Sequence, residues 1–392
     1  MMRVLFDFQA FDMQSHGGVS RCFAELYKHL PASVDAKFGI YETENVYLQD
    51  MGFHPAGYTY EHFLSKRNFP LKWELYKAYY NIKLGHPGRW NHKPMLNEFE
   101  SETLLEQGDF DVFHPTFFFS YFLEHLHGKP FVLTIHDMIP ELYPQYFTAN
   151  NDQIVNRRLL VPLAAHIIAV SEQTKKDVMR LLNVPEEKIT VIYHGADTMP
   201  YVPSADADKG FEYILFVGER HTYKNFMPFC EAVIPVLKRH PNLKVVCTGH
   251  PFSRDELAYF ERYGLADRFV HQFMKSNQAF MDLYHHAVAF VYPSDYEGFG
   301  IPILEAYKAD CPVMLNRTSC FPEIAGDAAI YFQMGQGGSD FEEQFEALYQ
   351  MTGDEREALL AIQRERLKLY SWDDAAQKLA DVYQKVVSTN DL

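Results

Sequence analysis

The sequence predicts an α/β protein with two doubly wound domains, each built on a parallel sheet. Short apolar runs typical of buried strands alternate along the chain with amphipathic segments typical of helices. At 392 residues, the chain is long for one domain and comfortable for two. A stretch of small polar residues with two prolines, 196–209, is typical of a linker. We therefore expect a first domain over residues 1–200 and a second over 201–370.

The composition narrows the class of protein. Hydrophobic residues at 47% and charged residues at 22% indicate a folded globular chain. A net charge of −16 argues against a nucleic-acid partner, because phosphate neutralisation needs a basic face. The five cysteines have no C-x-x-C spacing, which favours buried thiols in a reducing compartment. The first residues lack a signal-peptide pattern and no run approaches 18 apolar residues, so we expect a soluble, cytoplasmic protein.

A glycine loop follows the first predicted strand, at 3–8. Gly17 and Gly18 open a helix predicted over 20–30. Glycines let the backbone approach a bound group, and the amides at a helix start point outward. The loop is therefore a candidate cradle for an anion or a sugar, with a simple tight turn as the alternative.

Segment 58–93 is basic within an acidic chain, and aromatic residues interleave with its lysines and arginines. Four apolar residues recur in it at helical spacing: Leu71, Leu75, Ala78 and Ile82. A basic amphipathic helix with aromatics can lie on an anionic membrane surface, which would place the protein at the inner face of the membrane. The alternative is a solvated helix that packs one face on its own domain.

Polar residues end two further predicted strands of the first domain. His114 lies near the end of the strand at 111–116, and His136 with Asp137 ends the strand at 130–137. In open α/β sheets, ligands bind outside the carboxyl ends of the strands. His136 is therefore a candidate contact for a sugar or a phosphate.

The second domain repeats the alternation of strands and helices. Its predicted strands are 211–218, 243–249, 269–273, 287–292 and 312–315. Arg220 and Lys224 follow the first of them, four residues apart across a turn. Two cations there could converge on one anion and stabilise a departing diphosphate without Mg²⁺. Two solvated surface cations are the structural alternative.

A second glycine loop, at Gly298 and Gly300, separates a buried strand from a helix predicted over 301–308. The amides at the start of this helix suit a phosphate. Glu297 lies in the loop, and Glu305 lies eight residues later on the helix. A carboxylate accepts two hydrogen bonds from a vicinal diol, as on a ribose or a sugar ring. Two solvated surface glutamates are the alternative.

The string Glu-Gly-Phe-Gly-Ile-Pro-Ile-Leu-Glu-Ala, which begins at Glu297, resembles the E-x7-E signature of retaining GT-B glycosyltransferases of sequence family 4. The resemblance implies two Rossmann-like domains that face each other across a cleft. It implies that Glu305 holds the donor ribose and that Glu297 lies beside the donor sugar. It also places the backbone of Phe299, Gly300 and Ile301 beside the diphosphate.

Shorter motifs extend the resemblance over most of the chain. The loop at Gly17 and Gly18 is similar to one that faces the donor in the family. The strand that ends at His136 resembles the family strand whose histidine points at the donor sugar. Arg220 and Lys224 match the Gly-x-Arg…Lys-Asn pattern that meets the diphosphate.

Two other segments are interpreted through the same family. The resemblance implies that the C-terminal helix, 371–392, packs back on the first domain. Asp109 and Asp111 form a D-x-D sequence that metal-dependent glycosyltransferases also contain. Because this one precedes its strand, we expect no metal there.

The expected reaction moves a hexose-type sugar from a UDP- or GDP-linked donor to a hydroxyl of a glycan or polyprenyl-linked acceptor, in surface polysaccharide synthesis. The resemblance implies retention of configuration and no metal or other cofactor. The expected catalytic residues are Glu297, His136, Arg220 and Lys224. Two alternatives remain, a sugar-nucleotide epimerase with the same two-domain cleft and an inactive nucleotide-binding homologue. A dehydrogenase is disfavoured because no Gly-x-Gly-x-x-Gly follows the first strand.

Overall fold

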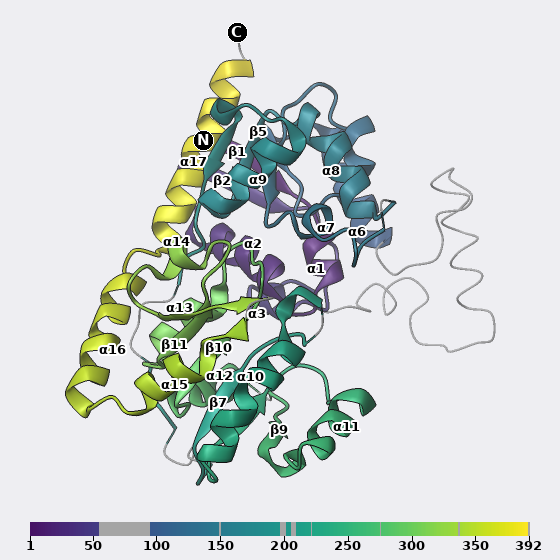
Figure 1. Ribbon diagram of the computed structural model, residues 1–392. Coiled ribbons are helices and arrows are strands. Elements are labelled where there is room, and N and C mark those ends of the chain that lie inside the picture. Colours follow the sequence, from purple (N-terminus) through teal and green to yellow (C-terminus); the bar gives the residue numbers. More distant parts are fainter. Residues whose placement is uncertain are drawn as a thin grey trace, which may run out of the picture. The chain divides into compact units, whose positions relative to one another are not determined.

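The computed structural model of the chain describes residues 1–54, 95–148, 150–196, 201–204, 209–220, 222–274, 276–335 and 338–390. The predicted basic aromatic helix at 58–93 lies outside these residues. The chain forms two compact units (Figure 1). The first comprises residues 1–134, 155–168 and 376–392, and the second comprises residues 135–154 and 169–375. Residues 135–154 and the stretch from residue 169 to residue 375 group with the second unit, whereas the sequence predicts a domain boundary near residue 200.

The first unit contains a three-stranded parallel sheet in the order β2-β1-β3. Its strands are β1 (Met2–Phe6), β2 (Val34–Phe38) and β3 (Val112–His114). The helices of this part of the chain are α1 (Gln9–Met13), α2 (Gly18–His29), α3 (Val46–Asp50), α6 (Met95–Gln107), η1 (Tyr121–Glu124), α8 (Asp152–Leu163) and α17 (Trp372–Asn390). Phe6 of the central strand packs against Phe23 of α2 and Tyr383 of α17. Tyr383 also hydrogen-bonds to His114, 2.6 Å between Oη and Nδ1.

A further three-stranded sheet has the order β4-β5-β6. Its strands are β4 (Val132–Ile135), β5 (His166–Ala169) and β6 (Ile189–Val191). The short helices near it are α7 (Ile139–Leu142), α9 (Glu172–Leu182) and η2 (Glu186–Lys188). Ser171 caps α9 by accepting a hydrogen bond from the amide of Thr174, 3.0 Å away.

The second unit contains a six-stranded parallel sheet in the order β12-β11-β10-β7-β8-β9. Its strands are β7 (Tyr213–Phe216), β8 (Lys244–Cys247), β9 (Phe269–His271), β10 (Ala289–Tyr292), β11 (Val313–Asn316) and β12 (Ile330–Phe332). The helices are η3 (Thr222–Lys224), α10 (Phe226–Arg239), α11 (Arg254–Arg262), η4 (Ala266–Arg268), α12 (Asn277–His285), α13 (Ile301–Lys308), α14 (Phe321–Ala325), α15 (Phe341–Tyr349) and α16 (Gly353–Leu367). The short strands β13 (Met334–Gly335) and β14 (Gly338–Ser339) pair antiparallel.

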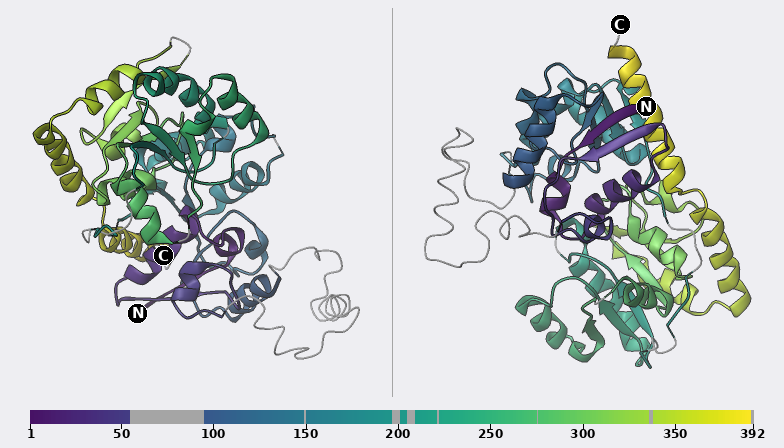
Figure 2. Two further views of the ribbon diagram at one scale, coloured as in Figure 1. Left: turned by 90° about the horizontal axis from the view of Figure 1, so that it is seen from below. Right: turned by 180° about the vertical axis from the view of Figure 1, so that it is seen from behind.

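Helices lie on both sides of this six-stranded sheet (Figures 1 and 2). Buried hydrophobic side chains form one cluster on each of its faces. Successive residues of β7 point to opposite faces. Leu215 accordingly packs in one apolar cluster with Ile303 of α13, whereas Ile214 and Phe216 pack in the other with α10. The sheet is therefore doubly wound, as predicted. Because β7 and β10 are parallel neighbours, the loops that follow them emerge at the same edge.

Two other features of the chain bear on the sequence predictions. All five cysteines are free and buried, as predicted. Among the helices in the described ranges, none is long and apolar enough to cross a membrane.

Candidate active site

Lys224 and Glu297 meet at the carboxyl edge of the six-stranded sheet. Lys224 ends η3 in the loop after β7, and Glu297 lies in the loop after β10. The Lys224 Nζ donates to Glu297 Oε1 at 2.6 Å. The two side chains are only 18% and 11% exposed, so their attraction is weakly screened. The structure thus joins one predicted cation to one predicted carboxylate.

A hydrogen-bond network holds these two loops together. The Asn225 side chain donates to Asp295 Oδ1 at 2.5 Å and to the Pro293 carbonyl at 3.1 Å. The Asp295 amide donates to the Tyr223 carbonyl at 2.8 Å. Asn316 adds a bond to the Ser294 carbonyl at 3.2 Å. These hydrogen bonds hold the two loops together, and so they keep Lys224 near Glu297 even without the ion pair itself.

Gly298 packs directly against the end of β4. A Cβ at this position would lie 1.7 Å from the carbonyl oxygen of His136. The Gly298 carbonyl accepts hydrogen bonds from Ser171 Oγ at 2.6 Å and from Thr174 Oγ1 at 3.3 Å. The close approach predicted for this glycine is thus made to the protein's own backbone. The loop that carries Glu297 is clamped between β4 and the start of α9.

His136 lies beside this clamped loop. It directly follows β4, is half-buried, and stacks on the His194 ring with 5.8 Å between ring centroids. His194 in turn packs edge-on against Phe299, with 4.8 Å between centroids. The structure therefore places His136 next to the Glu297 loop through Gly298 and through this aromatic chain.

The start of α13 presents backbone to the same edge of the sheet. Gly300, the residue before the helix, has φ 97°, a left-handed conformation that favours glycine. It offers no side chain to cap the first amides, which suits an anionic group. Phe299 is buried, and Ile301 is half-buried as the first residue of the helix.

Glu305 lies on the second turn of α13 and is half-buried. Its Oε2 accepts a hydrogen bond from the hydroxyl of Tyr284, 3.2 Å away. Tyr284 is fully buried on α12, so it fixes one carboxylate oxygen from within the protein.

Arg220 is bound by the protein's own carboxylate and carbonyl groups. Its Nε donates to Glu256 Oε1 at 2.8 Å. Its Nη atoms donate to three carbonyls of the loop after β8, those of Thr248 at 3.0 Å, His250 at 2.6 Å and Pro251 at 2.9 Å. The side chain is 5% exposed. Arg220 and Lys224 thus each pair with a different carboxylate, and their predicted joint contact with a diphosphate stays a prediction.

Glu256 was not singled out from the sequence as a site residue. Ser253 and Glu256 form a capping box at the start of α11, so the sequence signal of Glu256 is that of a helix cap. Burial acts to raise the pKa of Glu256, but the hydrogen bonds from Arg220 and from the Ser253 amide outweigh it and lower the pKa. Glu256 is therefore an ionised partner for Arg220.

In the glycine loop of the first unit, the Gln14 side chain binds a backbone amide near the start of α2. The Ser20 amide donates to Gln14 Oε1 at 3.1 Å. A Cβ at Gly17 would lie 2.4 Å from that oxygen. Gly17 therefore makes room for Gln14 at the start of α2, which begins at Gly18. The predicted contact of this loop with a donor stays a prediction.

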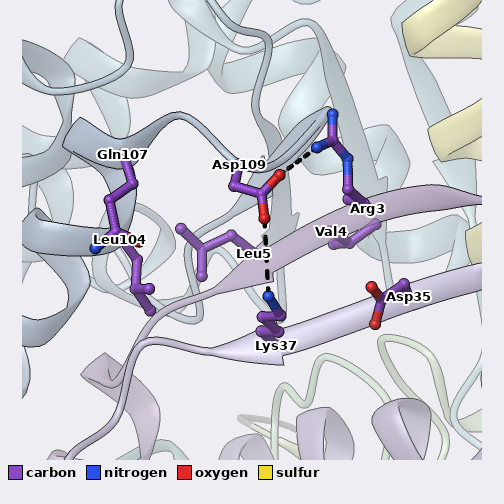
Figure 3. Close-up of a pocket in the computed structure, with 8 residues that line it drawn as sticks. All are labelled: Arg3, Val4, Leu5, Asp35, Lys37, Leu104, Gln107 and Asp109. Carbon is purple, nitrogen blue, oxygen red and sulfur yellow. Dashed lines mark hydrogen bonds and ion pairs between the residues drawn. The ribbon is translucent and has the colours of Figure 1, made fainter.

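The D-x-D carboxylates form ion pairs with basic residues of the first unit. Asp109 pairs with Arg3 and, at 4.0 Å, with Lys37 (Figure 3). Asp111 accepts from the Arg3 Nη2 at 2.7 Å. These contacts give both carboxylates a structural role. Within the described part of the chain, no three His, Cys, Asp or Glu side chains are grouped in a way that could hold a metal ion.

Two family models match consecutive parts of the chain. The model for Glycosyltransferase Family 4 matches residues 47–199, and the model for Glycosyl transferases group 1 matches residues 201–358. The second match contains Lys224, Glu297 and Glu305. The chain belongs to the family 4 glycosyltransferases.

Two relatives of this glycosyltransferase are named as O-antigen chain mannosyltransferases. It is 25% identical to O-antigen chain mannosyltransferase B of Escherichia coli over 335 residues, 81% of each chain. It is 30% identical to O-antigen chain mannosyltransferase RfbU of Salmonella typhimurium over 203 residues, which are 51% of this chain and 55% of that relative. The chain thus spans about half the length of the second of these relatives.

Solved structures confirm the predicted GT-B fold. Anabaena Alr3699/HepE, solved with UDP and glucose, aligns over 98% of this glycosyltransferase and 100% of its own chain, with a TM-score of 0.70 and 15% identity. Sucrose-phosphate synthase from Thermosynechococcus elongatus aligns over 99% and 100%, with a TM-score of 0.65 and 16% identity. At these identities the likeness is one of fold.

Proposed function

We propose that this family 4 hexosyltransferase moves a hexosyl unit from a UDP- or GDP-linked donor to a hydroxyl of a glycan or lipid-linked acceptor, with retention of configuration and without a metal. The observation that carries the proposal is the 2.6 Å pair between Lys224 and Glu297 beside the uncapped start of α13. Both O-antigen relatives are named mannosyltransferases, and another, from Xanthomonas campestris, is named as using GDP-mannose. HepE was solved with UDP.

Lys224 stabilises the leaving group in the proposed reaction. A departing nucleoside diphosphate accumulates negative charge on its phosphate oxygens. A partly buried ammonium group aimed at those oxygens interacts more strongly than a solvated one, because little water screens it. The start of α13, at Gly300 and Ile301, would supply backbone amides to the same phosphates.

Glu297 and His136 act on the sugar side. As the bond to the diphosphate lengthens, the sugar ring gains positive, oxocarbenium-like charge. A carboxylate held beside it stabilises that charge, and the hydrogen bond from Lys224 keeps the Glu297 side chain oriented until the donor arrives. His136, fixed through its carbonyl contact with Gly298, would orient a sugar hydroxyl.

Glu305 holds the donor ribose in this scheme. One carboxylate oxygen is fixed by Tyr284, and a carboxylate has enough acceptor sites to receive the two hydroxyls of a vicinal diol as well. This contact recognises a ribonucleotide whatever its base.

We assign Arg220 a positioning role in place of direct contact with the diphosphate. Its guanidinium gathers the carbonyls of Thr248, His250 and Pro251, so it shapes the loop after β8. Glu256 balances its charge. Through that loop, Arg220 would influence donor binding without touching the phosphates.

The acceptor in this proposal is a growing surface glycan or a polyprenyl-linked saccharide. The relatives named for O-antigen chains and for a cellobiosyl-diphosphopolyprenol support it. A reaction on such an acceptor would take place at the cytoplasmic face of a membrane.

The first test is binding and slow hydrolysis of UDP-glucose, UDP-N-acetylglucosamine and GDP-mannose in the presence of EDTA. Wild-type protein is expected to bind one nucleotide class and to release its sugar without metal. NMR of the first-formed product is expected to show that the anomeric configuration is retained. Lys224→Ala should bind the donor yet release sugar far more slowly. Lys368→Ala, which removes an exposed lysine paired with Glu365 on α16, is the matched control and should match wild type.

Other outcomes would contradict the proposal. Conversion of the donor to its epimer without sugar release would indicate an epimerase. Binding without any turnover, with or without added saccharides, would indicate an inactive homologue. Turnover that EDTA abolishes would overturn the metal-independent mechanism.

A further inference from the structure

A group of tyrosine rings lies beside the Lys224–Glu297 pair. Tyr143 and Tyr146 follow α7 and stack on each other, with 6.2 Å between ring centroids and 17° between ring planes. Tyr143 also lies 5.8 Å from the Tyr223 ring and contacts the Tyr296 ring edge-on at 6.4 Å. Tyr146 is 47% exposed and Tyr143 is half-buried, so an aromatic surface reaches the solvent here.

Two of these rings, Tyr223 and Tyr296, belong to the loops that carry Lys224 and Glu297. Tyr223 directly precedes Lys224, whose Nζ lies 5.3 Å from the Tyr223 ring centroid. Tyr296 directly precedes Glu297, and its hydroxyl donates to Asp177 Oδ2 at 2.7 Å. The rings therefore lead from the solvent-exposed Tyr146 to the residues that we assign to the reaction. Backbone hydrogen bonds at Tyr143, Tyr146 and Tyr223 hold the segments that carry these rings, which reduces the entropy cost of binding a ligand.

The chemistry around the rings favours a neutral, hydroxyl-rich ligand. Burial, and next the carboxylates of Asp295, Asp177 and Glu297, raise the pKa of Tyr143 to about 12. Because Arg180 pairs with Asp177 and Lys224 pairs with Glu297, the charges beside the rings are already balanced, and a neutral ligand rich in hydroxyl groups suits them better than a further ion does.

We propose that Tyr143, Tyr146 and Tyr223, here called the tyrosine platform, form a saccharide subsite that holds a pyranose ring of the acceptor. One face of a pyranose carries C–H groups whose partial positive charge meets the negative face of an aromatic ring. Tyrosine supplies such a face at little conformational cost, with a hydroxyl left to bind water or sugar. The inference rests on the proposed function and deepens it, because it makes the acceptor a sugar at the site of attack.

Two other occupants of the tyrosine platform are outcomes of the test. A nucleotide could stack its base on the tyrosine rings, and an anionic membrane surface could also meet them. Both would bring further negative charge beside the Lys224–Glu297 and Arg180–Asp177 pairs, which are already balanced, whereas a neutral sugar brings none.

The test uses methyl α-D-mannopyranoside, methyl β-D-glucopyranoside and methyl N-acetyl-β-D-glucosaminide as probes in saturation-transfer NMR. Wild-type protein is expected to transfer saturation to the ring C–H groups of at least one probe. Tyr146→Ala should weaken that binding about three- to tenfold. Tyr146→Phe keeps the ring and should bind as wild type does. Tyr263→Ala is the matched control, because Tyr263 is 39% exposed and lies at the end of α11 with its ring 4.8 Å from that of Tyr259.

Binding of UDP and GDP, measured on the same variants by calorimetry, separates this inference from the proposed function. We expect Tyr146→Ala to leave nucleotide affinity unchanged. Nucleotide binding without saccharide binding in the wild type would overturn the saccharide subsite and leave the transferase proposal standing. If the wild type binds a saccharide through Tyr146 but binds neither UDP nor GDP, the saccharide subsite stands and the transferase proposal is overturned.

Two further results would reassign the tyrosine platform. Loss of UDP or GDP affinity in Tyr146→Ala would make it a base-stacking surface. Binding to phosphatidylglycerol vesicles that Tyr146→Ala abolishes and Tyr263→Ala does not would make it a membrane contact. Either result contradicts the saccharide subsite.

Discussion

The carbonyl oxygen of His136 and the α-carbon of Gly298 are so close that no side chain fits between them. A Cβ on residue 298 would lie 1.7 Å from that oxygen, and the next atoms, the His136 carbonyl carbon and Asp137 Cβ, would lie at 2.9 and 3.2 Å. Two elements far apart in the sequence are thus joined by backbone contact. This contact positions both Glu297 and His136, the two residues that we assign to the donor sugar.

Gly298→Ala should therefore both destabilise the protein and reduce its turnover. A methyl group cannot displace a backbone carbonyl without moving the loop, so we expect a loss of about 3 kcal/mol in the free energy of unfolding, the upper end for overpacking. Chemical denaturation and donor hydrolysis would measure the two effects.

Gly353→Ala is the control for that variant. Gly353 is the first residue of α16, and nothing lies within 4 Å of a Cβ built on it. Alanine should be neutral there or stabilising by up to about 1 kcal/mol. Equal effects of the two substitutions would contradict the close approach at Gly298.

Lys224→Ala is expected to lower the rate of sugar release by a factor of ~10² to 10³, since the loss of one leaving-group donor typically costs ~2.7–4 kcal/mol of transition-state stabilisation. The variant also leaves Glu297 partly buried without its cation. Glu297→Gln on the same background should restore part of the lost stability but none of the lost rate. Single-turnover hydrolysis and thermal unfolding of both variants would check this. A rate within tenfold of wild type would remove Lys224 from the mechanism.

Local sequence patterns predicted the parts of the site that lie within one loop. The E-x7-E string identified Glu297 and Glu305, and apolar runs identified β7 and β10, whose ends bring Lys224 to Glu297. The capping of α9 by Ser171 was equally local. Such features leave a mark in a single sequence because spacing along the chain determines them.

Contacts between distant segments could not be predicted in this way. Glu256 is 36 residues from Arg220, and the sequence shows it only as part of a helix cap. Glycine at position 298 suggested room for a ligand, whereas tertiary packing fills that space with the His136 carbonyl. The strand β12, three residues long, was missed because so short an apolar run has no clear period.

Glu256→Gln should loosen the loop after β8 and destabilise the protein in a pH-dependent way. The folded-state pKa of Glu256 is lowered, so its ionised form contributes stability above the ordinary pKa of a glutamate. That contribution is lost as the pH falls through the folded-state pKa. We therefore expect the variant to be less stable than wild type by about 2 kcal/mol at neutral pH and to approach wild type in acid.

The same variant tests the positioning role of Arg220. If Arg220 acts through the loop at 248–251, Glu256→Gln should raise KM for the donor and leave kcat nearly unchanged. A lower kcat at constant KM would instead indicate that Arg220 meets the leaving group. Glu342→Gln is a suitable control, since Glu342 forms an exposed pair with Arg239 far along the chain from the loop.

Glu305→Ala should weaken nucleotide binding only where the nucleotide carries a ribose diol. Tyr284 already fixes one oxygen of this carboxylate, so the proposed bonds to the two ribose hydroxyls form without reorganising the side chain. Hydrogen bonds to a charged group contribute about 1.5–3 kcal/mol, which corresponds to a loss of about 10- to 150-fold in affinity for UDP or GDP. The 2′,3′-dideoxy form of the same nucleotide should bind wild type and variant alike. Calorimetric titration of both nucleotides into both proteins gives the four affinities of a double-mutant cycle. A variant that loses affinity equally for the dideoxy nucleotide would show that Glu305 supports the fold of α13 and does not contact the ribose.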